Sequence, residues 1–166
     1  APGDLTELAA EFAGENWDPR LQHFISLIDK TFWWGLHDHE PLTNWSKGNI
    51  TLLGDAAHTM LPHAGQGVNQ AIEDAITLAF FLKEAEGEDG IAEAFKRYTA
   101  IRMQRTAILQ NSSRRSGNQF DARNEFEDIK KRDADLRAGR DFRRSVLFDF
   151  DAVKAAEKAL NRFRRI

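Results

Sequence analysis

A short apolar run, a polar loop and the start of a helix follow one another between residues 50 and 74. The loop offers a carboxylate, two imidazoles, a rigid proline and the free backbone N–H groups with which a helix begins. The side chains concerned are Asp55, His58, Pro62 and His63. A carboxylate at the carboxyl end of a strand can accept hydrogen bonds from ligand hydroxyl groups, and ligands of open α/β sheets bind beyond such strand ends. Asp55 is therefore a candidate for binding a ribose or ribityl hydroxyl group.

The same residues also have purely structural explanations. Asp55 could cap the following turn or neutralise a nearby base. Gly65 and Gly67 lack Cβ atoms, so the backbone there can adopt positive φ and let a flat, negatively charged ligand approach the helix start. A tight turn with close packing is the commoner reason for a GxG before a helix, and Pro62 could serve only to fix the loop. The residue types alone leave both interpretations open.

A metal site is a third interpretation of this region. Histidines occur at positions 37, 39, 58 and 63, and Glu40 is beside the second of them. Their spacing matches no zinc-site pattern, and the chain has no cysteine, which removes thiolate ligands, disulfides and cysteine nucleophiles. We therefore predict no metal, and we interpret the histidines as structural or substrate-facing.

Composition indicates one ordinary globular domain. The 166 residues are 42% hydrophobic and include 12 Phe and 4 Trp, which is enough for a core. The formal net charge of −3 creates no positive field for nucleic acid or for an anionic membrane surface. No stretch approaches the ~20 apolar residues that span a bilayer. We expect a soluble, cytoplasmic protein with neither nucleic-acid nor membrane partners.

Helical patterns precede and follow the loop. We expect helices at residues 5–14 and 18–30, one from 68 to about 85 that is buried on most sides, and one from 91 to a break near Gly117. Interspersed charges at residues 121–144 predict an exposed or partner-covered helical appendage, and the last stretch predicts a further helix.

Two strands are predicted as well. Residues 31–38 are rich in aromatic and β-branched types, which favours a strand bulged at Gly35. Ile50 to Leu53 is apolar except for the β-branched Thr51, which favours a parallel strand buried on both faces. Such a strand needs neighbours, which must come from elsewhere. The predicted fold class is an α/β fragment that is mostly helical.

A longer pattern surrounds these candidates. It consists of Gly54-Asp55-Ala56-Ala57-His58, Pro62, Gly65-Gln66-Gly67, Asn69 and Glu73-Asp74-Ala75, with flanks at Asp38 to Pro41, Trp45 and Tyr98 to Arg105. Together these residues resemble the second flavin-binding motif of the FAD-dependent aromatic hydroxylases, the single-component, salicylate hydroxylase-like flavoprotein monooxygenases. The resemblance covers roughly residues 15–117. It implies the C-terminal part of a Rossmann-like FAD-binding fold, with a strand from the substrate domain and trailing helices.

The resemblance also implies roles for single residues. Asp55 would contact the ribityl chain, and Pro62 would lie close to the flavin ring. The pyrimidine edge of the ring would lie along Gly65, Gln66, Gly67, Val68 and Asn69. Reduced flavin carries negative charge at that edge, which a helix N-terminus stabilises. The candidates for a catalytic role are Pro62 and His63. By analogy of position the substrate candidates are Trp33, Leu36 and His37, although core packing is an alternative for Trp33.

The implied reaction is reduction of FAD by NADH or NADPH, formation of a flavin 4a-hydroperoxide with molecular oxygen, and hydroxylation of a small aromatic or heteroaromatic substrate. The chain contains no strand followed by GxGxxG and no middle Asp-Gly motif of the family. The expected partner is therefore the complementary N-terminal FAD-binding segment of the same enzyme.

The predicted division of the chain has three parts. Residues 1–48 belong to the substrate-domain side, residues 49–117 to the FAD-binding domain, and residues 118–166 to a charged helical extension. The alternative function is a non-catalytic helical interaction module, or a fragment that does not bind flavin by itself.

Overall fold

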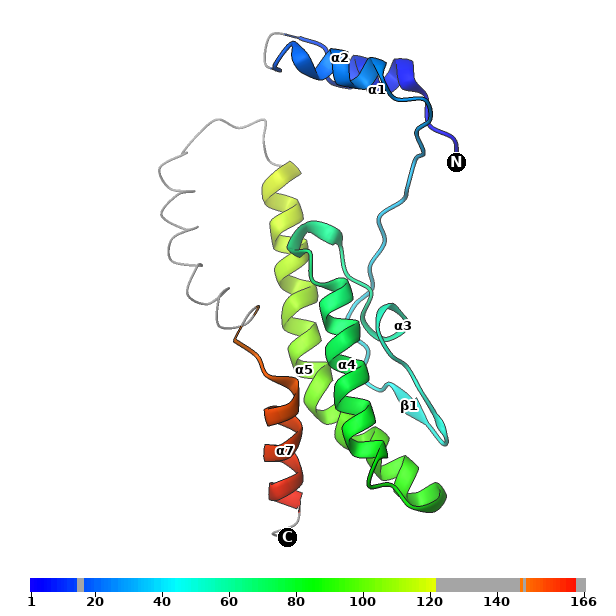
Figure 1. Cartoon of the computed structure of the whole chain (residues 1–166), viewed down its shortest axis with the longest axis vertical. Coiled ribbons are helices and arrows are strands. Elements are labelled where there is room, and N and C mark those ends of the chain that lie inside the picture. The colour runs from blue at the N-terminus through cyan, green and yellow to red at the C-terminus, as the bar shows by residue number, and fades with distance from the viewer. Residues whose placement is uncertain (15–16, 122–146, 148, 164–166) are drawn as a thin grey trace. The chain divides into compact units, whose positions relative to one another are not determined.

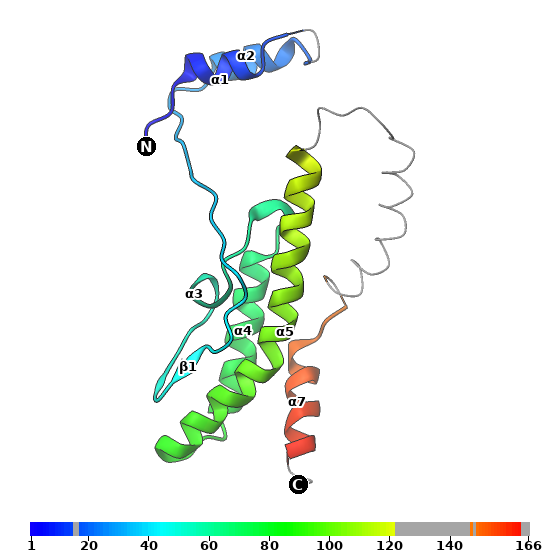
Figure 2. The same cartoon turned by 180° about the vertical axis from the view of Figure 1, so that it is seen from behind.

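The computed structural model describes residues 1–14, 17–121, 147 and 149–163 (Figures 1 and 2). This part of the chain is mostly helical, with one small sheet of two strands. It divides into two compact units, Ala1–Leu36 and His37–Ile166. Within the described residues, none of the helices is long and apolar enough to cross a membrane.

The first unit is a pair of short helices, α1 (Leu5–Glu11) and α2 (Arg20–Ser26). The Asp4 side chain caps α1 by accepting a hydrogen bond from the Thr6 backbone N–H at 2.7 Å. The Gln22 side-chain amide of α2 donates to the carbonyls of Ala9 and Phe12 and so joins the two helices. Both predicted helices are confirmed, with earlier ends than expected.

The predicted strand over residues 31–38 is wrong. In this segment only Phe32 makes a β-bridge, to Pro2, and the side chains of Trp33 and Trp34 are exposed. Aromatic and β-branched residues favour a strand only where another backbone is present to pair with them. Beyond that single bridge, the described residues supply none.

The second unit is built around two long helices. Its elements are β1 (Ser46–Lys47), β2 (Ile50–Thr51), α3 (Asp55–His58), the 3-10 turn η1 (Pro62–Ala64), α4 (Gly67–Leu82), α5 (Gly87–Asp121) and α7 (Ala152–Phe163). Helices α4 and α5 lie side by side, and α7 packs against both of them (Figures 1 and 2). The helices predicted around residues 68–85 and in the last stretch are confirmed.

The core of this unit is formed by α3, α4, α5 and α7 together with Trp45, just before β1. Its buried members are Trp45, Ala57, Phe81, Ala94, Tyr98, Ala156 and Leu160. The Trp45 ring packs against the rings of His58 and Tyr98, with centroid distances of 5.3 and 5.6 Å. The Tyr98 hydroxyl donates to the Leu52 carbonyl at 3.1 Å, which ties the chain just before the polar loop to α5.

The run from Ile50 to Leu53 and helix α4 are both less buried than predicted. The run from Ile50 to Leu53 is not a buried parallel strand, because only Ile50 and Thr51 pair, in antiparallel fashion, with β1, and Ile50 is 72% exposed. Helix α4 is not buried on most sides, because Val68, Ile72 and Ile76 are exposed along one face. In both cases the apolar side chains lack the covering elements that the sequence pattern assumed, at least among the described residues.

The predicted break near Gly117 is also wrong, because α5 continues to Asp121. A Cβ atom at Gly117 would lie 2.7 Å from Cδ2 and Nε2 of the His63 ring. The glycine therefore provides room for a close contact instead of ending the helix. Apart from Asp121, the appendage predicted for residues 121–144 lies outside the described residues.

Candidate functional site

The loop between β2 and α4 presents a carboxylate beside the start of a helix. Asp55 is exposed at the first position of α3, and its Oδ1 atom lies 4.0 Å from the point where Gly67 would carry a Cβ atom. No side chain among the described residues caps α4, whose backbone ladder begins with the bond from the Gln70 N–H to the Gln66 carbonyl at 2.9 Å. The N–H groups of residues 67–69 are thus the unsatisfied donors of a helix start. This corner can accept hydroxyl donors and stabilise negative charge.

Most of the residues predicted to bind a cofactor lie on the open side of this loop. The exposed ones are Asp55, Pro62, Gly65, Val68 and Asn69, while Gly67 is half-buried. Gly65 has a φ of 61°, as the glycine-rich pattern suggested, whereas Gly67 is the first residue of α4 and does not have a positive φ. Gln66 differs, because it is only 5% exposed and its Oε1 atom has no hydrogen-bond partner among the described residues. A buried acceptor without a donor is an unusual feature that a ligand could satisfy.

The two histidines of the loop point to protein neighbours. The half-buried His63 ring lies against the backbone of α5 at Gly117. The His58 ring is buried, and its Nε2 atom lies 2.6 Å from Oδ2 of Asp74. The described residues contain no group of three His, Cys, Asp or Glu side chains suited to hold a metal ion.

The predicted substrate residues fall at the boundary of the two units. Trp33 and Leu36 belong to the first unit and are exposed. His37, also exposed, is the first residue of the second unit. Their proposed role stays a prediction.

Asp74, on the buried side of α4, holds the loop through hydrogen bonds. Its Oδ2 atom accepts a hydrogen bond from the Gly54 backbone N–H at 2.9 Å as well as from His58, and its Oδ1 atom accepts one from Arg102 Nε at 2.7 Å. Burial raises the pKa of this carboxyl, but the hydrogen bonds from His58 and Arg102 outweigh it and hold the pKa below its usual value. Asp74 is therefore charged and acts as the acceptor in its contact with His58 Nε2. The hydrogen bond from the Gly54 N–H to Asp74 fixes the backbone next to Asp55.

A second acidic residue extends the buried network. Arg102, which is fully buried, also pairs with Glu73 and donates to Oε1 of Gln70 at 2.7 Å. Arg105 binds Glu73 through two hydrogen bonds of 2.7 and 2.8 Å, and its guanidinium carbon lies 3.9 Å from the centre of the Phe150 ring. Burial raises the pKa of Glu73, yet the two arginines lower it by more. The carboxylates of Asp74 and Glu73 thus neutralise the guanidinium groups of Arg102 and Arg105 between α4 and α5.

Sequence reasoning did not assign this network. Its members belong to the motif or its flanks, but charged residues on a helix usually indicate a solvated face. The available signal was that Asp74 and Arg102 each have apolar neighbours in their helical stretches, Ile72 and Ala75 beside the first and Ile101 and Met103 beside the second.

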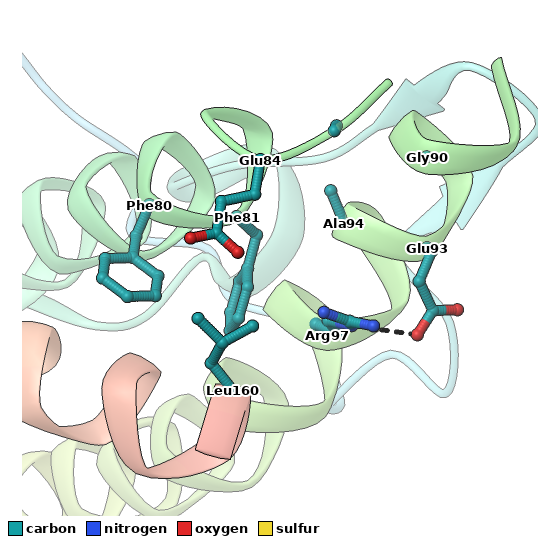
Figure 3. A pocket seen from close by; sticks show the side chains of 9 residues that line it. Phe80, Phe81, Glu84, Gly90, Glu93, Ala94, Arg97 and Leu160 are labelled. Atoms are coloured by element: carbon teal, nitrogen blue, oxygen red, sulfur yellow. Dashed lines mark hydrogen bonds and ion pairs between the residues drawn. The ribbon is translucent and has the colours of Figure 1, made fainter. Parts of the chain in front are cut away.

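A cavity of about 160 Å³ lies elsewhere, between α4, α5 and α7 (Figure 3). Phe81 and Leu160 line it, and so do Arg97 and Glu93, which form an ion pair of 2.9 Å. No predicted site residue contributes to it. The cavity is therefore separate from the Asp55 loop.

A family model described as "FAD binding domain" matches residues 27–113. The chain belongs to this FAD-binding domain family. It is 41% identical over 120 residues to 3-amino-4-hydroxybenzoate 2-monooxygenase PtnB3 of Streptomyces platensis, an alignment that covers 72% of this chain and 29% of that relative. These findings confirm the resemblance to FAD-dependent aromatic hydroxylases.

Two solved structures are also similar to the chain. A salicylate hydroxylase substrate complex superposes with a TM-score of 0.76 at 30% identity, covering 96% of this chain and 38% of that one. HpxO of Klebsiella pneumoniae complexed with FAD gives a TM-score of 0.60 at 32% identity, covering 69% and 30%. The chain thus spans less than a third of the curated relative and less than two fifths of either solved structure.

Proposed function

We propose that this chain forms part of an FAD-dependent monooxygenase that hydroxylates a small aromatic or heteroaromatic substrate, and that the Asp55 loop binds the flavin. One observation carries the proposal: the exposed Asp55 carboxylate lies beside the uncapped start of α4 in a member of the FAD-binding domain family. The relatives named above are monooxygenases or hydroxylases, or have been solved with FAD.

The residues of the loop fit a flavin. Asp55 can accept hydrogen bonds from ribityl hydroxyl groups, and the N–H groups of residues 67–69 can donate to the oxygen and nitrogen atoms of the pyrimidine edge. The Oε1 atom of Gln66 is an acceptor in need of a donor. Pro62 and Gly65 are exposed and leave the loop open on that side. The donors and acceptors of the loop therefore complement those of the ring and its side chain.

Bound FAD would supply the redox chemistry, by accepting a hydride from NADH or NADPH and activating molecular oxygen. One oxygen atom would enter the aromatic ring and the other would leave as water. The contribution of this chain is electrostatic and positional, since the helix start of α4 stabilises negative charge on the pyrimidine edge. Pro62 and His63 are the candidates beside the reacting ring, and Trp33, Leu36 and His37 are the candidates for substrate contact.

The proposed partner is the complementary FAD-binding segment of the same enzyme. Two observations support it: the chain spans under a third of a curated relative, and Val68, Ile72 and Ile76 expose apolar surface along α4. A segment that carries GxGxxG would hold the adenosine half of FAD. The same exposed face supports the second candidate, an interaction module that binds no flavin by itself. FAD titration of the 166-residue chain, alone and with the complementary segment, distinguishes the two.

Replacing Asp55 tests the flavin site directly. In the complete enzyme, Asp55→Ala removes the acceptor for the ribityl hydroxyl groups, and a hydrogen bond to a charged group is worth roughly 1.5–3 kcal/mol. We expect the FAD dissociation constant to rise roughly ten- to hundredfold, measured by flavin absorbance after desalting. Circular dichroism checks the fold. Asp89→Ala, an exposed aspartate at the start of α5, is the matched control. Stoichiometric flavin retained by Asp55→Ala would contradict the proposal.

A further inference from the structure

One face of α5 holds two separate segments of the second unit. Gln110, Ser113 and Arg114 lie on this face about one helical turn apart, and the first two are buried. The Nε2 atom of Gln110 donates to the Thr59 carbonyl at 2.9 Å and to the His39 carbonyl at 3.2 Å. A single side-chain amide therefore bridges residues that are far apart in the sequence.

The first of the two segments is the loop that carries the proposed flavin contacts. Besides the bond from Gln110 to Thr59, the Ser113 hydroxyl donates to the Leu61 carbonyl. The Thr59 hydroxyl in turn donates to the carbonyl of Asp55. The loop from Asp55 to Leu61 is thus attached to α5 by buried side-chain donors.

The second segment is residues 38–40, which directly follow the substrate candidate His37. Arg114 pairs with Asp38, donates to Glu40 at 2.7 Å, and donates to the His39 carbonyl at 2.7 Å. The bond from Gln110 to His39 adds an anchor that is closed to water, because Gln110 is 1% exposed. This segment is therefore held on the same face of the same helix.

We propose that Gln110 is a positioning residue. It sets the spacing between the proposed flavin loop, from Asp55 to Leu61, and the segment at residues 38–40, which directly follows the substrate candidate His37. This inference rests on the proposed function. The other two donors on this face each serve one segment, Ser113 the loop and Arg114 the segment at 38–40. Gln110 uses the two N–H donors of one planar amide for both, so neither segment can shift without breaking a buried hydrogen bond.

The bridge predicts a paired response to one substitution. Gln110→Met keeps a side chain of similar length and removes both donors. Measured by hydrogen–deuterium exchange of the complete protein, uptake in peptides covering residues 38–40 and residues 59–63 should rise together, each about fivefold for a lost bond of about 1 kcal/mol. Gln104→Met, an exposed glutamine on the same helix, should change neither peptide.

Two further variants sharpen this test. Ser113→Ala should loosen only the peptide at 59–63, because its bond reaches Leu61 alone. Gln110→Asn keeps the amide but is one methylene shorter, so it should repeat the paired increase in milder form if Gln110→Met does not fold. An increase confined to one of the two peptides in the Gln110 variants, or no increase in either, would overturn the inference.

Kinetics of the FAD-loaded protein give an independent readout. In Gln110→Met, a shift of the flavin loop relative to residues 38–40 should leave the flavin content unchanged. It should lower kcat/KM for the aromatic substrate by up to about a hundredfold and divert NAD(P)H oxidation to hydrogen peroxide. Normal coupling in Gln110→Met would count against the bridge while leaving the flavin site intact. A wild-type protein that binds no FAD would refute the proposed function, whereas the exchange experiment would still decide the bridge.

Discussion

Asp74 shows how a buried charge can serve an exposed site. The carboxylate is fully buried, yet hydrogen bonds reach it from Gly54, His58 and Arg102. A buried charge is tolerated when it is paired and its remaining lone pairs are satisfied. Here the Asp74 carboxylate fixes Gly54, the residue that precedes Asp55. The buried charge of Asp74 therefore helps to position the exposed charge of Asp55, which is proposed to face the ligand.

The stability of the protein should therefore depend on pH in the acid range. The pKa values of Asp74 and Glu73 lie below their ordinary values of 3.8 and 4.5, so the unfolded chain binds protons before the folded protein does. Their stabilising contribution is complete above about pH 5 and is lost as the pH falls through this range and below. Urea denaturation between pH 3 and pH 7 measures the effect.

Asp74→Asn identifies the source of that dependence. Removing one member of a buried pair costs about 3–5 kcal/mol. The variant should be less stable than the wild type at neutral pH, and its stability should decline less steeply toward acid. Asp89→Asn, at an exposed position, should retain the wild-type profile. Equal acid slopes for the wild type and Asp74→Asn would show that other carboxylates dominate.

At the scale of elements, the fit of η1 against α5 depends on a missing side chain. Gly117 lies inside α5, where glycine is about 1 kcal/mol less favourable than alanine. Its lack of a Cβ atom lets the His63 ring approach to a distance that alanine would not allow. The helix thus gives up some intrinsic stability for a contact with the loop of the proposed site.

A double-mutant cycle tests this trade. Gly117→Ala alone should destabilise the protein by about 1–3 kcal/mol, because the new methyl group displaces His63. In a His63→Ala background the same substitution should instead stabilise by up to about 1 kcal/mol, since only helix propensity remains. Urea unfolding of the four proteins gives the coupling energy. A stabilising effect of Gly117→Ala with His63 in place would disprove the contact.

Helices were predicted well and strands poorly, for a physical reason. The cap at Asp4, the hydrogen bond that Asp18 accepts from the Arg20 N–H, and the apolar spacing of α4 are local signals that act within one or two turns. A strand depends on a partner backbone, so the apolar run at Ile50 could not reveal that it pairs for only two residues.

The candidate site divides in the same way. The motif was sufficient to locate Asp55 and the glycine-rich loop, because these residues are contiguous in the sequence. The pairing of Arg102 with Asp74 joins positions 28 residues apart and exists only once α4 packs on α5. The double role of Gln110 likewise depends on that packing.

At the scale of the whole molecule, the C-terminal helix completes the core of the second unit. Ala152, Ala156 and Leu160 recur every four residues along α7, and all three are buried. Phe150, just before this helix, stacks on Arg105 of the buried network. Helix α7 therefore supports the helix pair that carries the proposed flavin loop.

Ala156→Asp tests whether α7 stabilises the whole unit. Ala156 is fully buried within the core cluster, so the variant would place a carboxylate where no partner has been provided. We expect a loss of at least about 3 kcal/mol, which for a protein of this size lowers the melting temperature by about 6–12 °C. Asn161→Asp adds the same charge to an exposed position of α7 and should shift the melting temperature by less than about 2 °C.

Because α7 packs on both α4 and α5, flavin release should follow the same lowered transition in the loaded enzyme. Equal melting temperatures for the two variants would mean that α7 contributes nothing to the core in solution.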